Sequence, residues 1–419
     1  MSNHQNVLVP IETWAYSAPA LKAAGKSIDI GIFAEALIYY DCVIVNPINP
    51  LQFSQFIQWF IRQDRLDDFY ALLQEGYLKI YDYAFITTVL KKEGIYSLLN
   101  MQHTNQIDKN TFEQRYLYHP SVENLFRKTS HRKKLYSALR ENVIEVKAEE
   151  FSNAIINARK DFNDSRRHAL VLQAFVDELY KFKNLGRPPI IEATVTQKSD
   201  TTKYNVTWNI DMQELEKQSG KYIKFHNGIP LTASAHSNRL IWSAANLESD
   251  LYLSTPMSTL VGDKLYESAE KISKAGKIIE ELKVEVEFPD VRNLVNSGKM
   301  DLGHVLEIRK KAKKFRNWLQ QESDRDRNAI IAYHHEVARD CNIKSGLRKA
   351  MNIFGVLSGG AVGGTVGSLI GGPIGGAVGG TAGSAVGYLA DVTSKIGKNW
   401  RPVIFGEWLK GRIEEVVKE

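Results

Sequence analysis

The stretch from Gly355 to Gly387 constrains this chain more than any other feature, because small residues return at every fourth position along it. Residues four apart lie on one face of an α-helix, and two such sets run side by side here. The first set is Gly355, Gly359, Gly363, Gly367, Gly371, Gly375, Gly379, Gly383 and Gly387, and the second is Gly360, Gly364, Ser368, Gly372, Gly376, Gly380 and Ser384. Faces without large side chains let a second helix backbone approach closely, which favours helix association in lipid.

The length of this stretch and its lack of charge predict a membrane segment. No charged residue occurs from Ala350 to Ala390, and about 20 apolar residues of helix cross a bilayer core of about 30 Å. The stretch is roughly twice that length, and Pro373 lies between two pairs of glycines, where a helix breaks readily. We therefore expect a hairpin of two helices, over Ala350 to Ile370 and over Ile374 to Ala390.

The glycine content makes insertion conditional. Each glycine destabilises a helix interior by about 1 kcal/mol relative to alanine, so this run is a poor helix in water. In hydrocarbon an unpaired backbone group costs several kcal/mol, and helix formation removes that cost. Because the run has few large apolar side chains, we expect it to be masked in one state and embedded in another. The alternative interpretation is a glycine-rich hairpin packed inside a soluble core.

Basic and aromatic residues bracket the run, and we expect them at the membrane surface. A hairpin of two helices returns to its starting side, so both flanks would stay cytoplasmic, as basic residues prefer. The residues of these flanks are Lys344, Arg348, Lys349, Lys395, Lys398, Trp400, Arg401 and Trp408.

A charged helix is predicted further upstream, over "DLGHVLEIRKKAKKFRNWL". Its periodicity places an apolar stripe on one face and the basic residues largely off that face. The stripe is Leu302, Val305, Leu306, Ala312, Phe315 and Leu319, and the basic residues are Arg309, Lys310, Lys311, Lys313, Lys314 and Arg316. We expect this basic face to be solvated, which is the usual state of such a run, and anionic headgroups are a second interpretation.

The repeat "GGAVGGTVGSLIGGPIGGAVGGTAGSAVG" resembles the glycine zippers of membrane proteins, which include small outer-membrane lipoproteins, channels and pore-forming toxins or effectors. Unlike the lipoproteins, this chain has no lipidated export signal and places the zipper after a long globular part. The resemblance implies an intracellular effector whose N-terminal part senses a signal and whose C-terminal hairpin perturbs a membrane, as in prokaryotic toxin and anti-phage defence systems. It indicates no family for residues 1–345.

The remainder of the chain predicts an α+β fold that is predominantly helical. A hydrophobic content of 43% and a net charge of +6 are ordinary for a globular protein. We expect five parts. They are a helix-rich α/β sensor or scaffold domain (1–187), a small β-rich unit (188–262), a charged helical region (263–345), the zipper hairpin (346–395) and an amphipathic tail (396–419).

Several individual elements follow from periodicity. The first helix carries Ile32, Phe33, Ala36, Leu37 and Tyr40, a buried strand covers Cys42 to Val45, and a second helix follows over 53–61. Gly76 ends the next helix before a strand-like run, 77–85. The alternation in 190–197 and 203–211 predicts a hairpin, and 221–228, 239–244 and 250–254 are shorter strand candidates.

Sequence signatures of enzymes are missing, so we expect no catalytic residues, no metal and no cofactor. The zipper glycines do not form GxGxxG, and no P-loop or GxSxG occurs. His334 and His335 lack the HExxH spacing, and adjacent helical residues point to different faces. Glu35 and Asp41 flank the buried strand, where we interpret them as structural. Two distant cysteines and a start without a signal-peptide pattern indicate the cytoplasm, with conditional insertion into the inner (cell) membrane.

These observations lead to a first hypothesis, a membrane-active effector. In it, a cytoplasmic sensor region controls insertion of the zipper hairpin, which forms homo-oligomers with membrane lipids around it and permeabilises the membrane. An activating protein partner is compatible with this hypothesis, and nucleic acid is disfavoured because the basic cluster has many other uses. The alternatives are a soluble interaction or scaffold protein that docks a partner through the glycine hairpin, and, further behind, a nuclease-type enzyme.

Overall fold

The structure is a computed structural model that describes only part of the chain. The described residues are 6–13, 18–47, 49–81, 85–92, 95–103, 113–126, 128–144, 158, 160–197, 203–219, 223, 228–253, 257, 260–261, 263, 291–314, 316, 412–413 and 415–416. The predicted zipper hairpin and both of its basic flanks lie outside these residues. The fold described below is therefore that of the part before the zipper, together with four residues near the C-terminal end, of which Ile413 and Val416 pack in the core.

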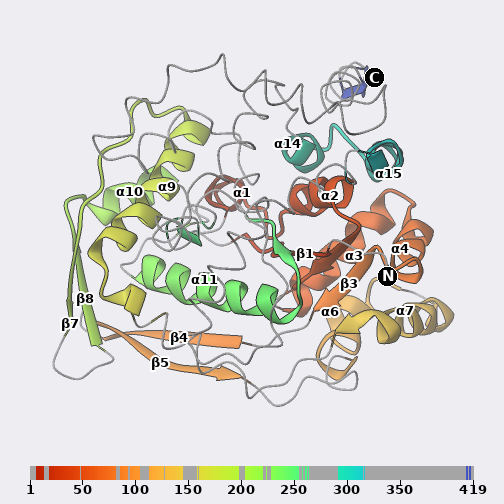
Figure 1. Cartoon of the computed structure of the whole chain (residues 1–419), viewed down its shortest axis with the longest axis horizontal. Helices are drawn as coiled ribbons and strands as arrows, with labels where there is room; N and C mark the ends of the chain where they lie inside the picture. The colour runs from red at the N-terminus through yellow and green to blue at the C-terminus, as the bar shows by residue number, and fades with distance from the viewer. Residues whose placement is uncertain are drawn as a thin grey trace, which may run out of the picture.

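A parallel sheet forms the centre of the described fold (Figure 1). Its strands lie in the order β6-β3-β2-β1-β9, and every neighbouring pair is parallel. Their bounds are β1 Asn6–Val9, β2 Cys42–Val45, β3 Leu78–Tyr81, β6 Val143–Ile144 and β9 Asp250–Leu251. The runs "NVLV" and "CVIV" have no polar face because both faces of the sheet are buried.

Helices cover both faces of this sheet. Alternate residues of β1 point to opposite sides, so Val7 and Val9 pack in one core and Leu8 in the other. The first core lies under α2 (Ile30–Tyr39), α3 (Pro50–Arg62), α4 (Leu66–Gln74) and α7 (Thr129–Asn142), and the second lies under α9 (Ser165–Lys183) and α11 (Gly228–Asn246). The first four strands advance across the sheet in one direction, and β9 then joins the opposite side of β1.

Helix and strand bounds on the first half agree with the sequence. β2 covers the predicted strand, and α2 carries the predicted apolar residues except Tyr40, which follows it as the C-cap. α4 ends before Gly76, whose φ of 73° lies in the left-handed region that glycine accepts readily. The shorter helices are α1 (Pro19–Ala23), α6 (Pro120–Glu123) and the π-helical turn η1 (Glu113–Leu117). The predominantly helical α+β fold is confirmed.

A second sheet is antiparallel, in the order β4-β5-β8-β7. The predicted hairpin is confirmed as β7 (Ala193–Gln197) and β8 (Lys203–Trp208), with Ala193 opposite Trp208. It continues a hairpin of β4 (Phe85–Lys92) and β5 (Ile95–His103), because Tyr96 pairs with Tyr204. Both sheets thus combine strands from the predicted parts 1–187 and 188–262.

Two of the shorter strand candidates come out differently. The run 239–244 was expected to be a strand, but it lies inside α11. A short apolar run fits a buried strand and a buried helix equally well. Here the run is part of a helix, which makes its backbone hydrogen bonds internally and packs against the sheet. The candidate 250–254 does form a strand, β9, although it joins the parallel sheet and not a β-rich unit. Of the candidate 221–228, only 223 and 228 are described.

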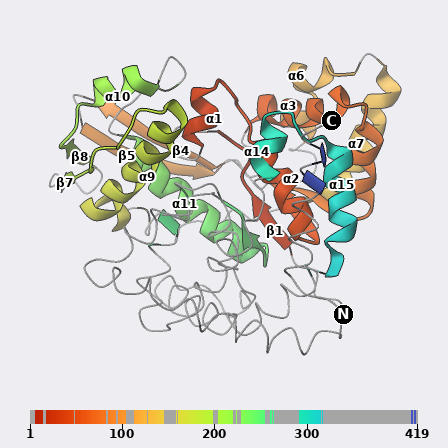
Figure 2. The same ribbon diagram turned by 90° about the horizontal axis from the view of Figure 1, so that it is seen from above.

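Two late helices pack against α2 in Figure 2, and they come from a distant part of the chain. α14 (Val291–Asn296) and α15 (Leu302–Lys311) precede the predicted zipper. The approach of α14 is so close that a Cβ on Gly31 would lie 2.1 Å from the carbonyl oxygen of Arg292. Position 31 therefore requires glycine.

Candidate functional site

The residues predicted to pack helices or to meet a membrane surface, from Lys344 to Trp408, lie outside the described residues. Their roles stay predictions. What the structure shows is how the chain before the zipper is held. Two groups of buried charges stand out, which we call the arginine clamp (Arg292, Arg309 and Arg316) and the switch-point cluster (Glu12, His236 and Arg239).

Arg309 of α15 binds the carboxyl-terminal end of α2. Its Nη1 donates to the carbonyl oxygen of Tyr40 at 2.6 Å and to that of Leu37, and its Nη2 donates to that of Asp41 at 2.7 Å. The last carbonyl groups of a helix have no partner within the helix and carry its negative dipole end. Burial and the neighbouring Arg316 lower the pKa of Arg309 to about 10, so the cation persists at neutral pH.

Arg316, seven positions after Arg309, adds to this contact. Its Nη1 donates to the carbonyl oxygen of Ile38 at 2.8 Å, and its Nε lies 3.4 Å from Oδ1 of Asp41. Asp41 is thus structural, as the sequence indicated.

The basic face predicted for this helix is wrong in two positions. Arg309 and Arg316 are buried, whereas Lys310, Lys311, Lys313 and Lys314 are exposed as expected. The periodicity of α15 separates apolar from charged residues, but it carries no information about the unpaired carbonyl groups of α2. Arginine buries its stem and still reaches several acceptors with its planar fork, which lysine does less well.

Arg292 of α14 binds the other end of α2. Asp29 caps this helix by accepting from the backbone nitrogen of Ile32 at 3.0 Å. The same carboxylate accepts from Arg292 Nε at 2.7 Å and from Asn296 Nδ2 at 2.7 Å. Both ends of α2 are therefore bound by the segment 291–316.

Glu178 of α9 lies beside this contact. Burial raises the pKa of its carboxyl group to about 7, although the charge of Arg292 and a 3.2 Å hydrogen bond from the backbone nitrogen of Ala20 lower it. Asp29 adds to the increase by repulsion. Glu178 thus changes charge near neutral pH next to the clamp.

The switch-point cluster lies where the strand order reverses. The connections from β1 lead to β2 on one side, and β9 enters on the other, so the carboxyl ends of β1 and β9 form a topological switch point. Glu12 follows β1, and α11 supplies His236 and Arg239. Glu12 Oε1 lies 2.6 Å from His236 Nε2 and 3.5 Å from Arg239 Nη2.

The protonation state of this cluster follows from its burial. Burial opposes ionisation of Glu12, but His236 and Arg239 outweigh it and lower the pKa of the carboxyl group. Burial and the charge of Arg239 lower the pKa of His236, against the attraction of Glu12. A carboxylate, a neutral imidazole and a guanidinium result, and Nε2 of His236 lies 2.6 Å from Glu12 Oε1 and 3.2 Å from Arg239 Nη2. In this arrangement the three side chains contact one another and join the segment after β1 to α11.

Glu35, the other acidic residue singled out from the sequence, also has a structural partner. Its Oε2 accepts from the hydroxyl of Tyr252 at 2.6 Å, and Tyr252 directly follows β9. The bond joins α2 to the carboxyl end of β9, one of the two strand ends at the switch point. Sequence spacing offered no signal for this pair, since 217 positions separate the two residues.

Comparison of the chain with protein-family models, with curated proteins and with solved structures found no match. Within the described residues, no helix has the length and apolar character needed to cross a membrane. The same residues contain no group of three or more His, Cys, Asp or Glu side chains arranged to hold a metal ion.

Proposed function

We propose that this chain is a membrane-active effector in which the α/β part restrains a C-terminal glycine-zipper hairpin. When the restraint is released, the hairpin inserts into the cell membrane, oligomerises through its glycine faces and permeabilises the bilayer. Anti-phage defence is one setting for such an effector. The geometric observation that carries the proposal is the arginine clamp, which binds the segment leading to the zipper onto both ends of α2.

The clamp supports regulation because it joins two parts of the chain that need not associate for either to form a helix. α2 belongs to the first crossover of the sheet, whereas α14 and α15 come after the last described strand. Buried arginines that bind backbone carbonyl groups are costly to leave without partners, so such a contact is either formed or broken as a unit. A contact of this kind fits a two-state switch.

The zipper itself is tested by adding bulk to its packing face. Replacing Gly375 and Gly379 together by leucine should abolish dissipation of the membrane potential in cells that express the chain, because the close approach of two helices is lost. Val378→Leu is the matched control, since it adds a methylene group between those glycines and outside both small-residue sets. The membrane potential is read with a voltage-sensitive dye.

Two results would contradict the proposal. One is full depolarisation by the double leucine variant. The other is a wild-type chain that never enters the membrane fraction under any condition that activates it. Loss of capture of a protein partner on deletion of 350–390, without an effect on the membrane, would favour the soluble interaction protein instead.

A further inference from the structure

Large apolar side chains gather in solvent where α9 ends. Phe182 is 46% exposed, Leu185 41% and Ile190 73%. The other exposed large apolar residues of the described chain lie apart from one another in sequence: Leu51 is in α3, Tyr77 precedes β3 and Tyr118 follows η1. Single exposed apolar residues are ordinary, whereas a group within nine positions marks an interaction surface. We call residues 181–190 the basic-apolar tip.

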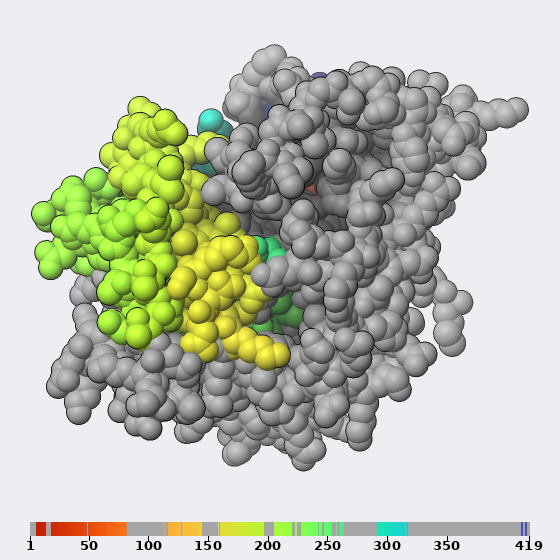
Figure 3. Space-filling view, turned by 60° about the vertical axis from the view of Figure 1, so that its left-hand side comes forward, coloured from red at the N-terminus to blue at the C-terminus, as the bar shows by residue number. Residues whose placement is uncertain are grey.

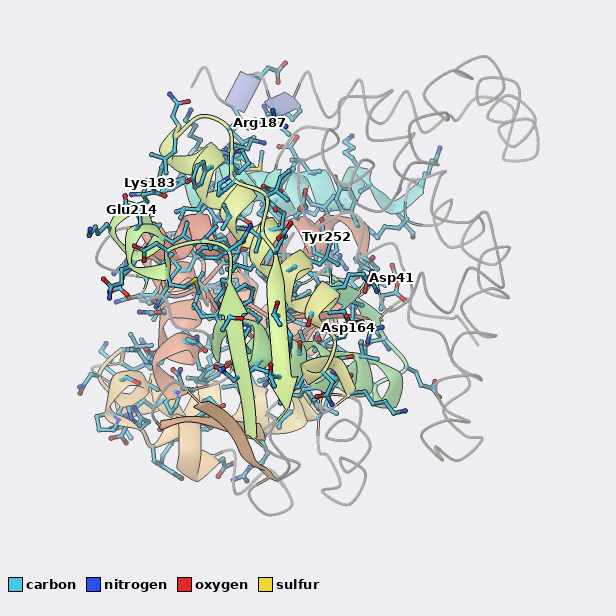
Figure 4. The ribbon with its side chains drawn as sticks, turned by 90° about the vertical axis from the view of Figure 1, so that its left-hand side faces the viewer. Asp41, Asp164, Lys183, Arg187, Glu214 and Tyr252 are labelled. Carbon is cyan, nitrogen blue, oxygen red and sulfur yellow. The ribbon has the colours of Figure 1, made fainter. Side chains whose placement is uncertain are left out.

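The tip is also positively charged. Lys181, Lys183 and Arg187 are exposed, and the tip itself contains no acidic residue, although Glu178 precedes it and the exposed Glu192 follows it. Figure 4 shows Lys183 and Arg187 toward the same end of the molecule, with Glu214 on that side as well. The carboxylate of Glu214 lies 3.5 Å from Lys217, which offsets its charge. Figure 3 shows the region from α9 to β8 at the surface of that face.

Hydrogen bonds fix the tip in place. α9 ends at Lys183, its C-cap Asn184 has a left-handed φ of 54°, and the backbone nitrogen of Leu185 donates to the carbonyl oxygen of Tyr180 at 3.0 Å. Gln173 Nε2 donates to the carbonyl oxygen of Pro189 at 3.1 Å, and Asn209 Nδ2 donates to that of Ile190 at 2.9 Å. The apolar side chains are thus exposed by an ordered backbone, which lowers the entropy cost of binding.

We infer that the basic-apolar tip binds the surface of an anionic lipid bilayer. Phe182, Leu185 and Ile190 match the boundary between headgroups and acyl chains, and Lys181, Lys183 and Arg187 match the anionic headgroups around them. A nucleic acid would satisfy the charges but would leave the aliphatic side chains in solvent, whereas a bilayer surface accommodates both kinds of side chain. The inference rests on the proposed action at a membrane and adds a docking surface that is separate from the zipper.

The test is flotation of the full chain with lipid vesicles. Vesicles of phosphatidylcholine and phosphatidylserine should bind the wild-type chain at least about tenfold better than phosphatidylcholine alone, since each basic residue near an anionic surface contributes about fivefold. Two tip variants should lose about tenfold or more of this binding. They are Phe182→Ser with Leu185→Ser and Ile190→Ser, and Lys181→Glu with Lys183→Glu.

Matched controls separate the tip from general surface properties. Leu51→Ser removes one exposed apolar side chain elsewhere, and Lys128→Glu with Lys133→Glu reverses two exposed lysines elsewhere. Both controls should bind vesicles like the wild type, and all variants should unfold thermally at the wild-type temperature. Equal loss in the controls, unchanged binding of the tip variants, or no binding by the wild type overturns the inference.

Dye release from the same vesicles distinguishes this inference from the proposed function. The Gly375→Leu and Gly379→Leu chain should still float with anionic vesicles but release no dye. Binding through the tip without dye release by any chain would contradict the zipper proposal and leave the tip standing. Binding of polyuridylic acid through the same side chains, with no vesicle binding, would make the tip a nucleic-acid site and overturn its assignment to membranes.

Discussion

Glu12 is buried, although its neighbours in the sequence do not indicate a partner for its charge. Its carboxylate is buried between His236 and Arg239, and removing one member of a buried charged group leaves the others without compensation. We expect Glu12→Gln to reduce the free energy of unfolding by about 3 to 5 kcal/mol. Urea unfolding followed by tryptophan fluorescence measures this loss.

The matched control removes the charges together. Glu12→Leu with Arg239→Met replaces the pair by apolar side chains of similar volume, and such replacements are often neutral or stabilising. A double-mutant cycle of Glu12→Leu, Arg239→Met and the double variant should therefore give a coupling energy between the two positions well above about 0.5 kcal/mol, which is the value for independent sites. If the single and double variants lose equal stability, charge compensation is not what holds the cluster.

Glu178 should make stability depend on pH. Its folded pKa of about 7 lies above the ordinary value of 4.5, so between these values the folded chain holds a proton that the unfolded chain has lost. The contribution of Glu178 to the free energy of unfolding is fully present below pH 4.5 and is lost as pH rises through 7. At about 1.4 kcal/mol per pKa unit, the loss is at most about 3.5 kcal/mol.

Glu178→Gln should remove this contribution. Its stability relative to the wild type should increase from pH 5 to pH 8, as measured by urea unfolding at a series of pH values. Glu75→Gln changes an exposed glutamate after α4 and is the control. A constant difference between wild type and Glu178→Gln across this range would show that the carboxyl group does not titrate there.

At the level of the element, the contact between α2 and α14 depends on Gly31. Alanine normally stabilises a helix by up to about 1 kcal/mol over glycine. At Gly31 its Cβ would meet the backbone of Arg292 at 2.1 Å, and overpacking typically costs about 1 to 3 kcal/mol. We expect Gly31→Ala to weaken the docking of α14 and to accelerate hydrogen exchange of the amides of α14 and α15.

Gly303 offers the matched control on the docked segment itself. Its added Cβ would meet Nη2 of Arg65 at 2.6 Å, which is the far end of a flexible side chain that can move away. Gly303→Ala should therefore leave exchange in α14 unchanged. If the amides of α14 and α15 exchange at the wild-type rate in the Gly31→Ala chain, then α2 and α14 can move apart slightly without undocking.

The elements that the sequence predicted well are those whose pattern is local. The β7–β8 hairpin alternates along its whole length, and α4 ends where Gly76 permits a left-handed turn. β9 and α11 were harder, because a buried apolar run does not say which partner buries it. The clamp was missed for a related reason. Its acceptors are backbone carbonyl groups, which every residue has, so the sequence does not indicate which of them bind a side chain.

For the whole molecule, the restraint and the zipper should act in sequence. If the docked segment holds the hairpin back, weakening it by about 1.4 kcal/mol raises the released fraction about tenfold. Gly31→Ala should then increase dye release from phosphatidylcholine–phosphatidylserine vesicles, whereas Gly303→Ala should not, because only the first disturbs the contact with α14.

Adding Gly375→Leu and Gly379→Leu to Gly31→Ala should cancel the increase, since a released hairpin still needs its glycine faces to oligomerise. Dye release that stays high in this triple variant would mean that the weakened fold itself disturbs the bilayer, and no increase in Gly31→Ala would separate the clamp from the control of the zipper.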